Sequence, residues 1–327
     1  MNKHAMAAAA LALIGSMAHA ESSVTLYGRI DLGVGNLKEL GESGSTQMFN
    51  GGDAGLTTSR IGFKGSEDLG GGTKAIFKLE QRINATDGSL QSPSFKGAAW
   101  VGVKGGFGQV IAGRMSTQLD DVRAVGNSQI VFDSAFTPGS NGVYKSGGDY
   151  SSRFNNQLQY QSPSMGGFYA GLGYAFEQTT GEDDKMNSLI VGYENGPLHV
   201  ALARQDEKGK DTDYISLSGA YDFGAAAISG GYNRRNGPDA SGKDNEFTIG
   251  ATVPMGNFKF SAGYAASKTT IGGSTAGKAS GFALGTTYSL SKRTRVYAGF
   301  RKHNVKDAGG NKTADTRLFA MGVRHDF

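Results

Sequence analysis

The chain has 327 residues, among them 52 glycines, 6 prolines and no cysteine, and its formal net charge at pH 7 is +4. So small a charge excess, without a basic tract interleaved with aromatic residues, argues against a nucleic-acid partner. The mean hydropathy is -0.34, and no apolar stretch after the first twenty residues is long enough for a membrane-spanning helix.

The first twenty residues have the organisation of an export signal. Lys3 and His4 precede an apolar run that starts at Ala5, and Ala18-His19-Ala20 has the small-x-small pattern of a signal-peptidase site. A spanning helix needs roughly 20 apolar residues, more than this run supplies. We therefore predict that residues 1–20 are removed and that residues 21–327 form one domain. An exported chain without cysteine has no disulfides to stabilise it, and a closed barrel needs none.

Apolar and polar residues alternate with a period of two along the mature chain. In the first candidate strand, VTLYGRIDLGV, one face carries apolar residues from Val24 to Val34 and the other carries Thr25, Tyr27, Arg29 and Asp31. The same alternation is present in segments that start at Ser59, Lys74, Phe168, Ile215, Phe247 and Phe258. A water-filled barrel requires charges on one face and apolar residues on the other, strand after strand. The segments around Trp100 and Tyr297 are ambiguous in phase, and their faces stay unassigned.

Short and long connections alternate between these segments. Seven are short, and eight polar ones are long, at about 36–57, 85–96, 115–150, 178–186, 206–212, 234–245, 266–279 and 304–314. Tight periplasmic turns and longer outer loops alternate in the same way in bacterial outer-membrane barrels. The connections predict an all-β fold, a 16-stranded antiparallel transmembrane β-barrel that is wide enough for an aqueous channel. A soluble adhesin or lectin sandwich also has many strands but does not require this asymmetry.

The last twelve residues, TRLFAMGVRHDF, form a strand with one apolar face that runs to the end of the printed chain. Phe319, Met321, Val323 and Phe327 share that face with His325. A lipid-facing strand that closes the barrel against the first strand accounts for this pattern, and the edge strand of a soluble sheet is the alternative.

Five segments together resemble the general porins of Gram-negative outer membranes, particularly the β-proteobacterial branch: VTLYGRIDLGV, TSRIGFKGSEDLGGG, SRFNNQLQYQSPSMGGFYAGLGYAF, YSLSKRTRVY and the final VRHDF. The resemblance covers essentially the whole mature chain. It implies an outer-membrane homotrimer of 16-stranded barrels, each with its own pore. It also implies that the third outer loop folds inward and narrows the channel opposite basic residues of the wall.

The longest connection, at about 115–150, matches that loop by its position. Structureless loops longer than roughly 15 residues are usually functional or disordered. Asp120, Asp121 and Asp133 are the predicted acidic residues of the constriction. A solvated surface loop is the alternative.

The basic wall is predicted from side-chain parity and from height in the membrane, because an inward residue five to seven positions from a short turn lies near mid-height. These criteria select Arg29, Arg60, Lys78 and Arg114, and Arg153, which lies somewhat higher, completes the predicted wall. Arg60, Arg114 and Arg153 also lie at positions that resemble the pore-wall arginines of the family. Gly97, Ala98 and Ala99 stand where relatives tend to have arginines, and this weakens the expected anion preference.

The predicted function is passive diffusion of small hydrophilic solutes and ions through a water-filled channel, with a weak to moderate preference for anions. Opposed charges across a narrow gap bias which ions pass. A substrate-specific channel is the main alternative, and an outer-membrane adhesin a lesser one.

No catalytic, metal or cofactor site is predicted. The mature chain has three histidines, His199, His303 and His325, and none lies in a recognisable nucleophile motif or metal-binding spacing. The glycine-rich stretches lack the Lys-Ser/Thr of a phosphate-binding loop. Phe327 with its alternating strand resembles the signal that the barrel-assembly machinery reads by strand addition.

Overall fold

The computed structural model describes residues 22–51, 55–129, 150–238 and 242–327. Two predictions lie outside this part of the chain: the export signal of residues 1–20, and Asp133 in the third outer loop. Among the described residues, no helix combines the length and the apolar character needed to cross a membrane.

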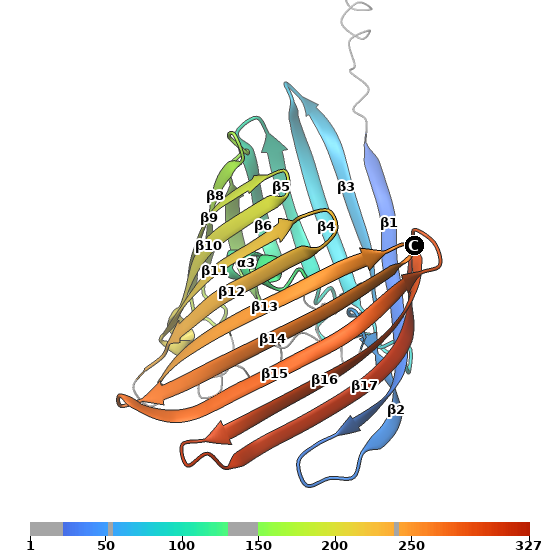
Figure 1. Cartoon of the computed structure of the whole chain (residues 1–327). Coiled ribbons are helices and arrows are strands. Elements are labelled where there is room, and N and C mark those ends of the chain that lie inside the picture. The colour runs from blue at the N-terminus through green and yellow to red at the C-terminus, as the bar shows by residue number, and fades with distance from the viewer. Residues whose placement is uncertain (1–21, 52–54, 130–149, 239–241) are drawn as a thin grey trace, which may run out of the picture.

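The described strands form a sheet of seventeen antiparallel segments that closes on itself as a barrel (Figure 1). From β3 onward, each segment pairs with its neighbour along the chain. The segments are β1 (Ser23–Lys38), β2 (Ser45–Asn50), β3 (Arg60–Gly70), β4 (Thr73–Arg82), β5 (Ala98–Gly105), β6 (Gly108–Ser116), β7 (Arg153–Gln161), β8 (Phe168–Ala175), β9 (Met186–Asn195), β10 (Leu198–Glu207), β11 (Thr212–Asp222), β12 (Ala227–Asn236), β13 (Lys243–Met255), β14 (Phe258–Ile271), β15 (Ser274–Ser289), β16 (Thr294–Asp307) and β17 (Lys312–Asp326).

The seventeen segments occupy sixteen positions in the barrel. One half of β1, Ser23–Arg29, pairs with β3, and the other half, Leu32–Leu37, pairs with β2. Because β2 and β3 are both antiparallel to β1, they share one strand position, in which β2 ends at Asn50 and β3 begins at Arg60. The predicted 16-stranded antiparallel barrel is therefore confirmed.

The first and last strands close the barrel. β1 pairs with β17 from Arg29, opposite Asp326, to Lys38, opposite Arg317. The N–H groups of Phe327 and Gly28 donate to each other's carbonyl oxygens at 3.0 and 3.1 Å. A Cβ at Gly28 would lie 2.4 Å from the ring of Phe327, so the glycine gives the terminal ring room to lie across β1. The predicted closure by the last strand is confirmed.

The alternation in the sequence corresponds to two faces of the wall. In β17, the exposed fractions of Phe319, Met321 and Val323 are 48%, 52% and 45%, whereas those of Leu318 and Ala320 are 1% and 0%. Large apolar side chains are thus exposed on the outside of the barrel, where lipid would cover them. Buried polar groups such as Gln205 and Ser216 face inward on other strands.

The register also settles the two ambiguous strands. Trp100 lies opposite Lys78 and packs on the inward cluster of Ile76, Ile111 and Met115. Tyr297 is buried on the inward face of β16. Both aromatic side chains therefore point into the barrel.

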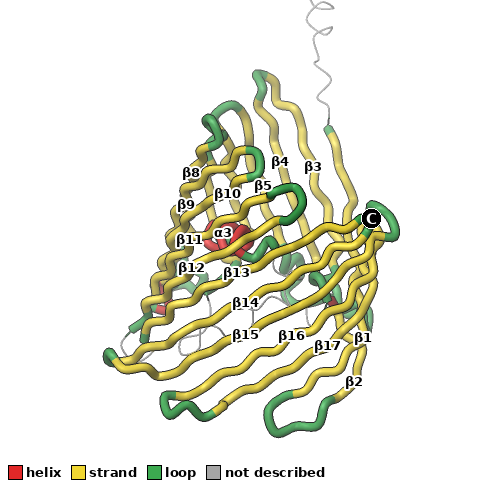
Figure 2. The backbone as a smooth tube through the Cα atoms, viewed as in Figure 1, coloured by secondary structure: helices red, strands yellow, loops and turns green. Residues whose placement is uncertain are grey.

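Several connections at the long-loop end are shorter than predicted (Figure 2). The predicted loop at 266–279 is reduced to the Gly272–Gly273 turn between β14 and β15, and that at 304–314 to residues 308–311. The predicted loop at 36–57 contains β2. The polar residues of these stretches do not prevent a strand, because the backbone ladder continues beyond the apolar band.

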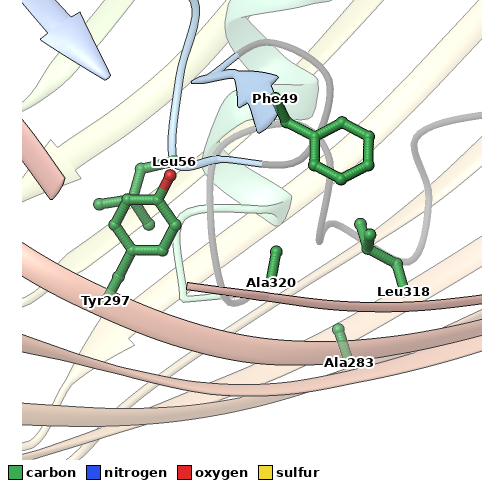
Figure 3. Packing of buried hydrophobic residues seen from close by; sticks show 6 residues of the cluster. All are labelled: Phe49, Leu56, Ala283, Tyr297, Leu318 and Ala320. Atoms are coloured by element: carbon green, nitrogen blue, oxygen red, sulfur yellow. The ribbon is translucent and has the colours of Figure 1, made fainter. Parts of the chain in front are cut away.

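Between β2 and β3, the described residues 51 and 55–59 leave the wall and pack inside the barrel. Leu56 and Phe49 lie against Tyr297 and Leu318 of the β16–β17 wall (Figure 3). The carboxylate of Asp31, which is fully buried, accepts hydrogen bonds of 2.9 Å from the N–H groups of Leu56 and Thr57 and one of 2.7 Å from the Tyr297 hydroxyl. One carboxylate therefore anchors this inward excursion.

Candidate functional site

Three arginines stand directly opposite one another on the inner wall. Arg29 of β1 is the cross-strand partner of Arg60 in β3, and Arg60 is the partner of Arg82 in β4. They lie on the face opposite Phe63, which is exposed on the outside. Like charges directly opposite each other destabilise a sheet, so this arginine row is not a feature that stability alone explains.

The carboxylate of Glu80 partly neutralises the arginine row. Arg60 Nη1 lies 3.2 Å from Glu80 Oε1, while its Nη2 donates to Thr57 Oγ1 at 3.0 Å. Glu80 also accepts a 3.0 Å hydrogen bond from the Tyr27 hydroxyl and lies 3.5 Å from Lys78 Nζ. Because Arg60 and Lys78 share this single carboxylate, a positive charge remains on the wall.

Arg29 takes part in a second shared ion pair. Its Nε lies 3.2 Å from Asp326 Oδ1 at the end of β17. The same carboxylate also pairs with Arg295 and Arg324, at 3.6 and 3.0 Å. Three arginines for one aspartate again leave an excess of positive charge, here next to the closure of the barrel.

Arg82 was not among the predicted site residues. Its Nε is buried and has no hydrogen-bond partner within the described part of the chain, and the charges of Arg60 and Arg153 both act on it. Arg82 shares the inward face with Lys78 and Glu80, but it is the last residue of β4 and lies farther from the short turn than the five to seven positions used in the prediction.

Arg153, at the start of β7, extends this positive surface. Its Nε donates to the carbonyl oxygen of Gly97 at 3.0 Å, so its partner carries no charge. A Cβ at Gly97 would lie 2.5 Å from Glu80 Oε1. The backbone of residue 97 thus fills the space beside Glu80, and the absence of a Cβ at Gly97 permits this close approach.

The register corrects the prediction for Arg114. Its cross-strand partner is Ala99, which in turn lies opposite Leu79 on the outward face. Gly113, with a φ of 135°, lies at an irregularity of the β6–β7 ladder, and the Arg114 side chain donates to Lys96 O at 3.1 Å and to Asn155 Oδ1 at 2.7 Å. Arg114 therefore stands on the other face of the wall from the arginine row.

A short helix, α3 (Gln118–Gly126), follows β6 and packs on the inner face of the opposite wall. The Thr117 side chain caps its N-terminus by accepting from the N–H of Asp120 at 3.3 Å. Leu119 and Val122, on one side of the helix, are buried against Ile190 and other residues of β9–β11. Figure 1 shows α3 within the ring of strands.

A buried ion pair fixes the second half of α3. Arg123 Nη2 lies 3.3 Å from Glu246 Oε1 of β13, and the exposed fractions of these two side chains are 6% and 0%. The guanidinium carbon also lies 4.7 Å from the centroid of the Tyr150 ring. Ser229 Oγ donates to Gly126 O at 2.8 Å, which attaches the C-terminal end to β12.

The two described aspartates of the predicted constriction lie in the first turn of α3. Asp120 Oδ1 accepts a 2.6 Å hydrogen bond from the Tyr150 hydroxyl. Asp121 is exposed to the interior of the barrel. Enclosure by the barrel and the neighbouring carboxylate of Asp120 raise the pKa of Asp121 to about 6, although the charge of Arg153 opposes this shift.

The geometry brings four of the five predicted wall residues to one side of the interior: Arg29, Arg60, Lys78 and Arg153. It adds Arg82 and leaves out Arg114. The carboxylates of α3 lie on the other side, within electrostatic range of Arg82 and Arg153. Among the described residues, no group of three or more His, Asp or Glu side chains is placed to hold a metal ion.

Comparisons with known proteins identify the family of this chain. The profile of the family described as Gram-negative porin matches residues 7–308. Outer membrane porin protein 32 of Delftia acidovorans is 33% identical over an alignment that covers all of both chains.

Solved structures have the same fold. The anion-selective porin from Comamonas acidovorans superposes with a TM-score of 0.78 at 31% identity, and the match covers 94% of this chain and 100% of that one. OmpT of Vibrio cholerae in its trimer form superposes with a TM-score of 0.69 at 18% identity, over 94% of this chain and 99% of that one. The chain belongs to the Gram-negative porin family and is an outer-membrane porin channel.

Proposed function

We propose that this porin is a general diffusion channel with a weak to moderate preference for anions. The observation that carries the proposal is the arginine row, Arg29, Arg60 and Arg82, which lies near Arg153 and shares few carboxylates. A wall with excess positive charge attracts anions and repels cations, and salt screens the effect. Glu80, Asp120 and Asp121 keep the preference modest.

We further propose that the segment 115–150 narrows the channel. In support, α3 packs on the inner faces of β9–β12, away from its neighbouring strands β6 and β7. The acidic first turn of α3 then faces the basic wall across the water path. Ions that pass between them experience a transverse field, which is strong where the gap is narrow and the dielectric constant is low.

Reversal potentials in a planar bilayer with a salt gradient test the anion preference. We expect a potential of the sign that anion permeation gives, and a decrease of that potential as the ionic strength rises. A clear cation preference at low salt would contradict the proposal.

A substrate-specific channel would behave differently from a general pore. Current block that saturates with one sugar, phosphate or carboxylic acid would indicate a specific site. We expect no such saturation, and fluxes that decrease steadily with the size of the solute.

The assembly proposals rest on less specific observations. We propose a homotrimer because one structure with the same fold is described as a trimer form. We also propose cleavage after Ala20 and recognition of Phe327 by the assembly machinery, since Phe327 completes the β1–β17 closure. Deletion of Phe327 should lower the amount of folded barrel in the outer membrane without changing the conductance of the channels that assemble. The porin relatives support the absence of a catalytic role.

A further inference from the structure

Arg301 of β16 lies on the inward face of the barrel and is buried. Its cross-strand partners are Ala283 of β15 and Leu318 of β17, and the exposed fractions of Arg301, Ala283 and Leu318 are 6%, 0% and 1%. Both partners belong to the apolar cluster that packs inside the barrel with Leu56 and Phe49 (Figure 3). The side chain of Arg301 therefore has apolar neighbours and little contact with water.

Arg301 has no partner for its charge in the described part of the chain. The Nε and Nη1 atoms of its guanidinium are buried and have no hydrogen-bond partner there. No charge of another described group acts on this guanidinium. Arg123 and Arg235 are also buried, but each of them is paired with a carboxylate. Arg301 thus differs from both in its electrostatic surroundings.

The strand register explains why the wall supplies no partner. The residues level with Arg301 on the neighbouring strands are small or apolar: Gly263 of β14, Ala283 of β15, Leu318 of β17 and Leu37 of β1. None of these four positions carries a side chain that can accept a hydrogen bond from a guanidinium. The acceptor must therefore come from another source.

This part of the wall is separate from the arginine row. Leu37 of β1 is level with Arg301, whereas Arg29 of β1 belongs to the arginine row. An extended strand rises about 26 Å from Arg29 to Leu37, toward the long-loop end. Arg301 and the arginine row are therefore distinct features of the interior.

The physical chemistry of arginine requires a counterion here. A charge that has lost its contact with water is strongly unfavourable unless it is paired. Arginine cannot relieve this cost by losing its proton, because its side chain stays protonated in proteins. Buried polar groups without a protein partner usually bind water or an ion. We propose that the guanidinium of Arg301 holds a resident small monovalent anion, of the kind of chloride.

The charge and the burial of Arg301 determine the kind of anion. One negative charge neutralises one guanidinium, whereas a divalent anion would leave a negative charge buried without a partner. A bulky organic acid does not fit beside a guanidinium that is so little exposed between Ala283 and Leu318. A small inorganic anion can accept charge-assisted hydrogen bonds from Nε or Nη1. Because such an anion is enclosed, it stays at the wall and carries no current.

The first test locates the anion directly. Bromide replaces chloride at such sites and is visible by its anomalous scattering, so crystals of the unmodified porin and of Arg301→Met are soaked in sodium bromide. We expect an anomalous peak within hydrogen-bond distance of Arg301 Nε or Nη1, and no peak at this place in Arg301→Met. A map of the unmodified porin without a peak at Arg301 would overturn the proposal.

The second test measures the effect of the anion on stability. Each protein is heated in detergent micelles, in mixtures of sodium chloride and sodium gluconate at constant ionic strength, because gluconate is too large for the enclosed site. The unfolding temperature of the unmodified porin should rise with the chloride concentration, since a ligand of the folded state stabilises it. Arg301→Met should lose this rise. In gluconate alone it should be at least as stable as the unmodified porin, because an apolar side chain replaces an unpaired buried charge.

Two further variants complete the second test. Arg295→Gln changes an arginine on the same face of β16 that is more exposed and lies 3.6 Å from Asp326, and it should keep the full chloride dependence. Arg301→Lys keeps the charge but has fewer donors, so it should need more chloride for the same rise. It also keeps the test informative if Arg301→Met does not fold.

Three results of the second test would contradict a resident anion. One is an unmodified porin whose unfolding temperature is the same in chloride and in gluconate. Another is a chloride dependence of the same size in Arg301→Met or Arg301→Lys as in the unmodified porin. The third is a loss in Arg295→Gln as large as that in Arg301→Met, which would assign the effect to the arginines of the wall in general.

Discussion

Arginine occurs on both sides of the barrel interior, but in two electrostatic states. On the wall of β1–β7, the arginines of the arginine row lie opposite one another on neighbouring strands. Arg60 shares the carboxylate of Glu80 with Lys78. On the wall of β12–β13, Arg235 is fully buried with Asp244, and Arg123 of α3 is buried with Glu246. The charge that an ion meets in the channel thus depends on how the cations are paired and not on how many there are.

The largest expected effect concerns the paired side. Glu246→Leu should destabilise the attachment of α3 by about 3–5 kcal/mol, because it leaves the buried Arg123 guanidinium without its carboxylate. The thermal unfolding temperature should decrease, and single-channel recordings should show a larger and noisier conductance. The double variant Arg123→Leu/Glu246→Leu should recover much of the stability. If Glu246→Leu unfolds like the unmodified porin, the ion pair does not fix α3.

The second effect concerns the unpaired side. Arg82→Ala combined with Arg153→Ala should remove most of the anion preference, because neither guanidinium has a described carboxylate partner in direct contact. Reversal potentials in a salt gradient measure the change. Arg114→Ala is the matched control and should leave the potential as it is, since Arg114 stands on the outward face. An equal shift in the control would place Arg114 back in the channel.

A change of the opposite sign should follow from removal of the shared carboxylate. Glu80→Gln keeps the shape of the side chain but releases the charges of Arg60 and Lys78. The anion preference should increase by a smaller amount than the double arginine variant removes. Ion substitution at constant ionic strength measures this, and a weaker anion preference in Glu80→Gln would contradict it.

The smallest expected effect depends on pH. The pKa of Asp121 is raised to about 6, so this carboxylate is charged at pH 7.5 and mostly neutral at pH 5. Protonation removes a negative charge opposite the arginine row, and the anion preference should therefore rise as the pH falls through about 6. Asp121→Asn should show, at both pH values, the anion preference that the unmodified porin shows at pH 5. It should therefore lose this transition. A transition of the same size in Asp121→Asn would assign it to another group.

The amino-acid sequence alone determined the barrel, because strand faces depend on a local period of two. Val24 to Val34 in β1 and Phe319 to Val323 in β17 alternate as they must when one face meets lipid and the other meets water. The alternation of connections gave the number of strands. The same local pattern placed Arg29, Arg60, Lys78 and Arg82 on the inward face.

Only the tertiary structure decided which charges act together. The regular pairing of Arg114 with Ala99, which lies opposite Leu79, places Arg114 on the outward face, and the phase of the strand around Trp100 could not be assigned from the sequence. The inward position of Leu56 and Thr57 depends on Asp31, which also binds Tyr297, a residue 266 positions away in the chain. The charge of Arg153 likewise acts on Arg82 only because the fold brings β4 and β7 to one wall. Local periodicity fixes the face of each residue, whereas pairing of charges depends on register and on long-range contacts.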